Sequence, residues 1–103
     1  MQIILKIFNL ENLLEIGNNF FKIGAITIQH GESEIFNSEA QNGKVFDFPT
    51  SFKNKCLTIV ATDVGSGTRT VGLDAISKKQ FKAFSREGTT VSGCRFHWLA
   101  VGF

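Results

Sequence analysis

The side chains that could perform chemistry in this chain do not assemble into a recognised catalytic pattern. Gly65-Ser66-Gly67 could cradle a phosphate, but no Lys-Ser or Lys-Thr follows at the spacing of a P-loop. A hydrolytic triad would need an accessible histidine, and His97 is expected in the middle of a packed strand. Asp63, Asp74 and Glu87 could supply two carboxylates for glycoside cleavage, but their spacing does not select that role. We therefore expect a protein that is not an enzyme and that uses no cofactor.

The two histidines could contribute to a metal site only in an assembly of several copies. A threefold axis would bring three copies of His30 or of His97 together, and a ring of imidazoles can hold a metal ion. This arrangement requires the side chain to lie on the axis, and ordinary strand histidines account for the same pattern. We expect no metal, and the ring remains an open alternative at this point.

Four polar residues in or beside predicted loops are candidates for ligand binding. Asp63 and Ser66 could hydrogen-bond to the hydroxyl groups of a sugar, whereas Arg69 and Arg86 could pair with acidic groups. The same four residues would also suit solvated turns.

Cys56 and Cys94 are the two thiols of the chain, and their spacing is not that of a metal site. Both lie in apolar, strand-like sequence. We expect two buried free thiols, and a disulfide only if adjacent strands bring them face to face.

Strands must position these residues, because the chain after Asn19 has the alternation and turn signals of β-structure. Strands are expected at 23–29, 34–36, 44–48, 57–62, 70–73, 80–84 and 96–103, with a glycine loop at 64–68. The Asn42-Gly43 pair is typical of a tight turn and predicts a hairpin between its two flanking strands. Short strands at even spacing, without a helical crossover, predict an all-β antiparallel sandwich.

The last eight residues are predicted to form a strand that is buried on both faces. Its two alternating sets are Phe96-Trp98-Ala100 and His97-Leu99-Val101-Phe103. Both sets contain large apolar groups, so neither face suits contact with water. We expect the C-terminus to be buried.

Residues 1–19 are predicted to form a short stem or linker ahead of a β-domain at 20–103. Apolar residues recur there at spacings of four and three, as at the end of a coiled coil, and they are Ile3, Ile7, Leu10, Leu14 and Gly17. Lys6 and Glu11 would lie where they could pair between parallel helices. The alternation in Ile3-Leu5-Ile7 also suits a strand. The stem is therefore expected to be helical or extended, with the helix favoured.

The composition favours one small domain that contacts other protein copies. The chain has 103 residues, of which 43% are apolar, 19% are charged and eleven are Phe, so some aromatic side chains are expected at a subunit interface. A net charge of +2 without a basic stripe disfavours a nucleic-acid partner. No secretory signal is evident, and no apolar run approaches the ~20 residues that cross a bilayer. We expect no membrane insertion.

Five segments, in order, resemble the C-terminal domain of bacteriophage tail fibre proteins. They are Lys22 to Gly31, Phe46 to Phe52, Cys56 to Thr62, Ser77 to Phe81 and the final aromatic-x-Trp-x-Ala-x-Gly-aromatic strand. The first segment closes on Gln, His and Gly, where the family usually has Gln, Trp and Gly. The second contains a Phe-Pro-x-x-Phe element. Together the five segments cover about residues 22–103.

The resemblance implies a homotrimeric β-sandwich at the tip of a fibre, as in phage tails or phage-tail-like bacteriocins. Its structural and trimer core would contain Phe48, Pro49, Phe52, Phe96, Trp98 and Phe103. The domain would bind a bacterial surface polysaccharide or lipopolysaccharide, and it would belong to a virion tail assembled in the bacterial cytoplasm. That reducing compartment disfavours a disulfide. The alternative is a trimerisation or capping domain that contacts no receptor.

Overall fold

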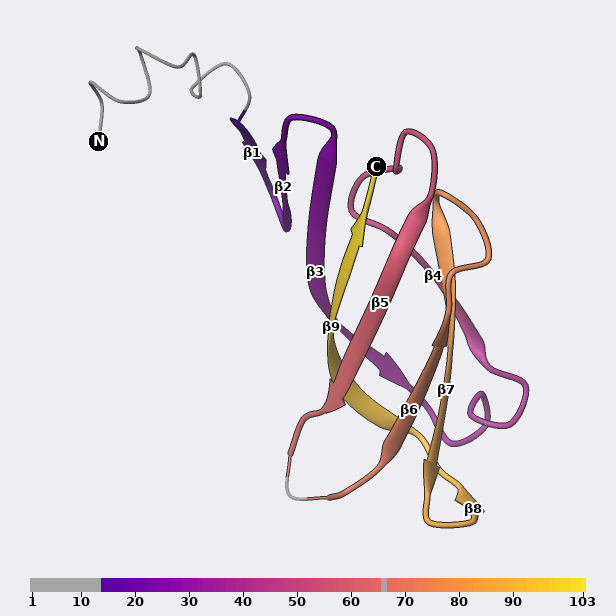
Figure 1. The fold of residues 1–103 in the computed structure, drawn as a ribbon. Coiled ribbons are helices and arrows are strands. Elements are labelled where there is room, and N and C mark those ends of the chain that lie inside the picture. The colour runs from indigo at the N-terminus through magenta and orange to yellow at the C-terminus, as the bar shows by residue number, and fades with distance from the viewer. Residues whose placement is uncertain (1–13, 66) are drawn as a thin grey trace.

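The computed structural model describes residues 14–65 and 67–103, and every regular element in these ranges is a β-strand (Figure 1). In chain order the strands are β1 (Leu14–Gly17), β2 (Phe20–Ile23), β3 (Ile26–Ile35), β4 (Lys44–Asp47), β5 (Cys56–Asp63), β6 (Thr70–Asp74), β7 (Gln80–Glu87), β8 (Thr90–Val91) and β9 (Cys94–Gly102). Within the same ranges, no helix is long and apolar enough to cross a membrane.

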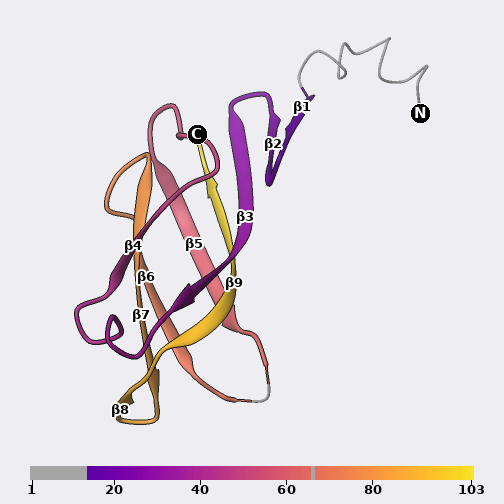
Figure 2. The same ribbon diagram turned by 180° about the vertical axis from the view of Figure 1, so that it is seen from behind.

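Two antiparallel sheets pack face to face, as Figures 1 and 2 show from opposite sides. The first sheet has five strands in the order β1-β2-β3-β9-β5. The second has the order β4-β7-β6, and β8 adds to it by pairing with β7. This arrangement confirms the predicted antiparallel sandwich.

The core lies between the sheets because facing strands bury every second residue. In β9 the buried residues include Phe96, Trp98 and Ala100, and in β7 they include Phe81 and Ala83. The ring centroids of Phe81 and Trp98 lie 5.0 Å apart in a tilted arrangement. Such aromatic pairs contribute about 0.5–1.5 kcal/mol beyond the burial of their area.

The Phe-Pro-x-x-Phe element closes one part of this core without forming a strand. Phe48 and Phe52 are both buried and pack edge to face, with their ring centroids 4.9 Å apart. Their backbone amides donate to the carbonyls of Lys79 and Lys78, at 2.8 Å each. The element is thereby fixed against the segment that leads into β7.

A buried amide side chain fastens the same element to the five-stranded sheet. Gln29 of β3 is fully buried, and its Nε2 donates to the carbonyl of Thr50 at 2.7 Å. The amide of Thr50 donates in return to Gln29 Oε1 at 2.9 Å. One side chain thus satisfies both backbone polar groups of Thr50, as a neighbouring strand would do.

One predicted hairpin and one predicted continuous strand are wrong. The Asn42-Gly43 turn does not join a hairpin, because β3 pairs with β2 and β9, and both of its edges are therefore occupied. The strand after the turn, β4, joins the other sheet through β7. The single strand expected at 23–29 is interrupted by a turn between β2 and β3. Gly24 has a φ of 58° there, a conformation that glycine adopts with little strain.

The expectation that both faces of the last strand are buried is wrong for the single chain. Phe96, Trp98 and Ala100 are covered by the second sheet, whereas His97 and Leu99 are exposed. A domain of two layers covers only one face of each sheet, so the outer face of β9 has no neighbour within the chain.

The predicted helical seam falls largely on residues 1–13, outside the described residues. Its last two members, Leu14 and Gly17, begin and end β1. This part of the stem is extended and pairs with β2. Asn19, with a φ of 67°, lies in the turn that joins the two strands.

Candidate functional site

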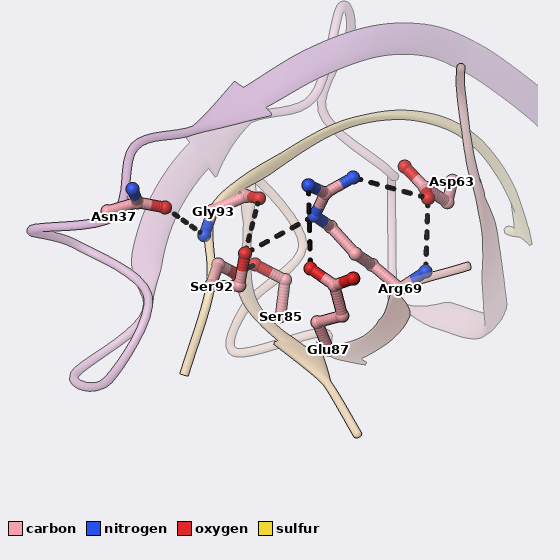
Figure 3. A network of polar contacts seen from close by, with 7 residues as sticks. All are labelled: Asn37, Asp63, Arg69, Ser85, Glu87, Ser92 and Gly93. Carbon is pink, nitrogen blue, oxygen red and sulfur yellow. Dashed lines mark hydrogen bonds and ion pairs between the residues drawn. The ribbon is translucent and has the colours of Figure 1, made fainter. Parts of the chain in front are cut away.

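A polar network closes one end of the sandwich (Figure 3). The loop between β5 and β6 leaves the sheet after Asp63 and returns at Arg69. The Arg69 amide donates to Asp63 Oδ2 at 3.0 Å, and Arg69 Nη1 lies 3.9 Å from the same oxygen. The Asp63 side chain is only 8% exposed. Two residues predicted to contact a ligand therefore bind each other and hold the loop closed.

The guanidinium of Arg69 also reaches residues beside the turn between β7 and β8. Its Nη2 lies 3.7 Å from Glu87 Oε2, and its Nε donates to Ser92 Oγ at 3.3 Å. The carbonyl of Ser92 accepts a hydrogen bond from the hydroxyl of Ser85 on β7. Arg69 therefore braces three segments of the chain at this end.

The other predicted ligand residues are placed differently. Ser66 lies outside the described residues. Arg86 is exposed on β7, opposite Thr70 and Val91 in the sheet register. Among the described residues, Asp63 Oδ1 is buried and has no hydrogen-bond partner. The structure thus brings Asp63 and Arg69 together and leaves Arg86 free to meet solvent.

The outer face of the five-stranded sheet carries a continuous set of apolar side chains, which we call the apolar face. Its members adjoin one another in the register of five strands, and they are Leu14, Ile16, Phe21, Ile23, Ile26, Ile28, Val60, Leu99 and Val101. Several are strongly exposed, among them Ile16 at 76%, Val60 at 57% and Leu99 at 44%. Water contact at so many adjoining apolar side chains is unfavourable.

A shallow groove of about 560 Å³ borders the apolar face. Val60, Leu99 and Trp98 line it together with the polar residues Asn19, His30, Glu32, Thr62 and His97. Glu32 Oε1 forms an ion pair with Arg95 Nε at 3.0 Å, and Glu32 Oε2 lies 3.6 Å from His97 Nε2. His97 therefore lies on the outer surface, and the prediction that it is packed is wrong. The described residues hold no cluster of three or more metal-ligating side chains suited to a metal ion.

The outer face of the four-stranded sheet has a different composition. Its outward residues are mostly polar or small, and they include Asp47, Thr70, Gly72, Asp74, Gln80, Lys82 and Arg86. Val45 is 46% exposed there, and Phe84 is half-buried. The two outer faces of the sandwich therefore differ sharply in their suitability for contact with water.

The two cysteines are free thiols, and only one of them is buried as predicted. Cys94 is buried and Cys56 is half-buried. Burial raises the pKa of both thiols, which keeps them protonated and poorly nucleophilic near neutral pH.

Four of the six residues predicted for the structural core are buried within the single chain, namely Phe48, Phe52, Phe96 and Trp98. Pro49 is exposed and Phe103 is half-buried. The apolar face is the feature that sequence reasoning missed as a surface. The sequence feature that could have indicated this surface is the presence of apolar residues in both alternating sets of the last strand.

A family model described as "Putative tail fiber protein gp53-like, C-terminal" matches residues 21–103. No curated protein matches the chain.

Solved pyocin tail fibres have a similar fold. A C-terminal part of the R2 pyocin fibre of P. aeruginosa aligns with a TM-score of 0.70 at 14% identity, over 87% of this chain and 25% of that chain. An N-truncated R1-type pyocin tail fibre aligns with a TM-score of 0.54 at 17% identity, over 87% of this chain and 84% of that chain. The chain thus spans a quarter of the R2 fibre fragment, and the likeness concerns the fold.

Proposed function

The chain belongs to the gp53-like family of tail fibre C-terminal domains, and on that premise we propose that it is the receptor-binding tip of a tail fibre. It works as a homotrimer that recognises a polysaccharide or lipopolysaccharide of the bacterial surface. It binds this glycan without cleaving it. Its place is the tail of a virion or of a phage-tail-like particle, after assembly in the bacterial cytoplasm.

The apolar face is the observation that carries this proposal. Soluble monomers rarely expose apolar patches larger than a few hundred Å², and larger patches mark contact with protein or membrane. Here the exposed apolar side chains adjoin one another across five strands of a small domain. A fibre supplies identical neighbours that can cover such a surface.

The loop end of the sandwich is suited to contact with a receptor. β1 and the C-terminus lie near one end, whereas the β5–β6 loop and the β7–β8 turn lie at the other (Figures 1 and 2). The loop end is therefore far from the point where β1 enters the domain. Arg86 and Glu87 are exposed there and can hydrogen-bond to sugar hydroxyls or to acidic groups. The Asp63–Arg69 contact keeps the neighbouring loop in shape.

Trimerisation gives a shallow sugar site useful strength. A single site with a millimolar dissociation constant has a binding free energy of about −4 kcal/mol. Three such sites that face one cell surface raise the apparent affinity by about 10²–10⁴ without any new contact. Display of three copies on one fibre is therefore part of the proposed mechanism.

The test compares binding of the trimer to bacterial cells and to isolated surface glycans. We expect Arg86→Ala to weaken binding about tenfold and to leave the melting temperature and the trimer unchanged. Lys53→Ala removes a charge from an exposed residue at the opposite end, where the amide of the next residue, Asn54, donates to the carbonyl of Phe103. This variant should bind as wild type does. Equal binding by all variants would reject the loop end as the site. Release of reducing sugar would reject the view that the glycan is not cleaved.

A structural capping role is the second candidate. It is favoured by the way Asp63 and Arg69 satisfy each other, because this leaves fewer charged groups for a ligand. A trimer that binds no glycan and no cell of the host species would move the preference to this role.

A further inference from the structure

We infer that the apolar face of the five-stranded sheet is the contact between copies of this chain, and that the four-stranded sheet faces outward. The inference rests on the proposed homotrimer and assigns its interface. The occupant of the apolar face is thus a second and a third copy of the same domain.

The first argument is the contrast between the two outer faces. Rows of register partners on the five-stranded sheet are apolar across several strands, as in Ile16-Phe21-Ile28-Val101. Rows on the four-stranded sheet are mostly polar, as in Asp47-Gln80 and Thr70-Arg86, although Val45 lies beside Lys82. Burial of apolar surface drives association. A trimer that left the five-stranded face in water would therefore lack most of this stabilisation.

The second argument is the state of the charges at the border of the apolar face. Glu32 is paired with Arg95 and lies near His97, and Arg95 also lies opposite Glu34 in the register. The Glu32 and Arg95 charges are matched within the chain. They therefore do not call for a partner of opposite charge, and they allow identical faces to approach without strong repulsion.

The third argument concerns the width of the face. The β1-β2 hairpin extends the apolar rows beyond the part of the sheet that the second sheet covers (Figure 1). Leu14, Ile16 and Ile23 on this hairpin are exposed. These side chains do not pack against the core of their own chain. A hairpin of this kind is stabilised when it lies against an adjacent copy.

Two valines on opposite faces provide a matched test. Val60 of β5 lies on the apolar face at 57% exposure, and Val45 of β4 lies on the other outer face at 46% exposure. We expect wild type and Val45→Glu to be trimers by light scattering at micromolar concentration. Val60→Glu should be a monomer, because three carboxylates would enter a contact without partners. Leu99→Glu, the cross-strand neighbour of Val60, should behave in the same way.

Cysteine labelling gives a second measurement that does not depend on the folding of a charged variant. In a background with Cys56→Ser and Cys94→Ser, the thiol of Leu99→Cys should react with a maleimide at least tenfold more slowly than that of Val45→Cys. Slow labelling at both positions, or fast labelling at both, would overturn the assignment of the face.

The outcomes separate this inference from the proposed function. A trimer that survives Val60→Glu and Leu99→Glu would overturn the interface and leave the proposed assembly standing. A wild-type monomer would overturn both. A trimer with the expected sensitivity that binds no cell or glycan would support the interface and reject receptor binding.

Discussion

Replacing Gln29 by Met tests whether one buried amide holds the Phe-Pro element in place. The substitution keeps a long unbranched side chain and removes both hydrogen bonds to Thr50. The Thr50 amide and carbonyl, which the structure places next to a fully buried side chain, then lose their partners. An unsatisfied buried backbone group costs about 1–3 kcal/mol. The greater apolarity of Met recovers part of this, so we expect a loss of about 2–4 kcal/mol in the free energy of unfolding.

The matched control is the same substitution at Gln80. Gln80 Nε2 donates to Asp47 Oδ1 at 2.9 Å, but this bond lies at the surface and water replaces it readily. Gln80→Met should therefore cost less than about 1 kcal/mol. Urea unfolding of wild type and both variants, at one protein concentration so that assembly affects all three in the same way, measures the difference. The reasoning fails if Gln29→Met and Gln80→Met lower the free energy of unfolding equally, and if the dependence of that free energy on urea concentration is the same for both variants.

A second substitution separates the donor from the acceptor at this site. Gln29→Glu keeps the oxygen that accepts from the Thr50 amide and replaces the donor by an acceptor that faces the Thr50 carbonyl. Burial disfavours the charged carboxylate, so its pKa in the folded state should lie above the pKa in the unfolded state. The folded state then binds the proton more tightly, and stability relative to Gln29→Met should improve as the pH falls below the folded pKa. A constant difference between these two variants across the pH range would argue against a buried carboxyl at this position.

Further substitutions test the core, a turn and the loop brace. Trp98→Ala should cost about 3–5 kcal/mol, because it leaves a large cavity between the sheets, and loss of soluble protein or an early urea midpoint would report it. Gly43→Ala should cost about 1–2 kcal/mol in urea unfolding, because the φ of 81° is unfavourable for a side chain and the new Cβ would approach an aromatic ring. Arg69→Met should cost about 1–3 kcal/mol, since it leaves the nearly buried Asp63 carboxylate with one fewer partner. Arg86→Met, at an exposed position, should change stability by less than about 0.5 kcal/mol, and equal losses at the two arginines would contradict the brace.

The strands themselves could be predicted because buried and exposed positions alternate along a strand, and the residue types alternate with them. The alternation of Phe81, Ala83 and Ser85 in β7, and of Phe96 and Trp98 in β9, matches the buried faces of the structure. Residue types alone also separated the end of β5 from the start of β6. These features depend on local sequence, and tertiary contacts only reinforce them.

Strand partners could not be predicted in the same way. The Asn42-Gly43 pair does reverse the chain locally, and Gly43 has the positive φ that such a turn requires. Whether the next strand returns to β3 depends on whether an edge of β3 is free. β9, which is more than fifty residues away in sequence, occupies that edge. Local turn chemistry contains no information about a distant competitor for the same backbone groups.

The candidate ligand residues show a related limit. Asp63 and Arg69 have the chemistry of a ligand site, and the sequence gives no sign that the loop folds back and pairs them. Arg86 is the predicted residue that stays available, because it lies on an outward position of β7. Charged side chains near a loop can serve a ligand or the loop itself, and only the three-dimensional distance between them separates the two roles.

The last strand shows how a wrong prediction about a chain can describe its assembly. Trp98 and Leu99 are neighbours with similar apolar character, and the sequence predicted burial for both. Within one chain the second sheet covers Trp98 and leaves Leu99 in water, because each layer of a sandwich has only one inner face. Selection for apolar residues on the outer face would be hard to explain in a solvated monomer. If three copies pack through that face, both residues are buried in the particle, and the sequence pattern records contacts that a single chain cannot make.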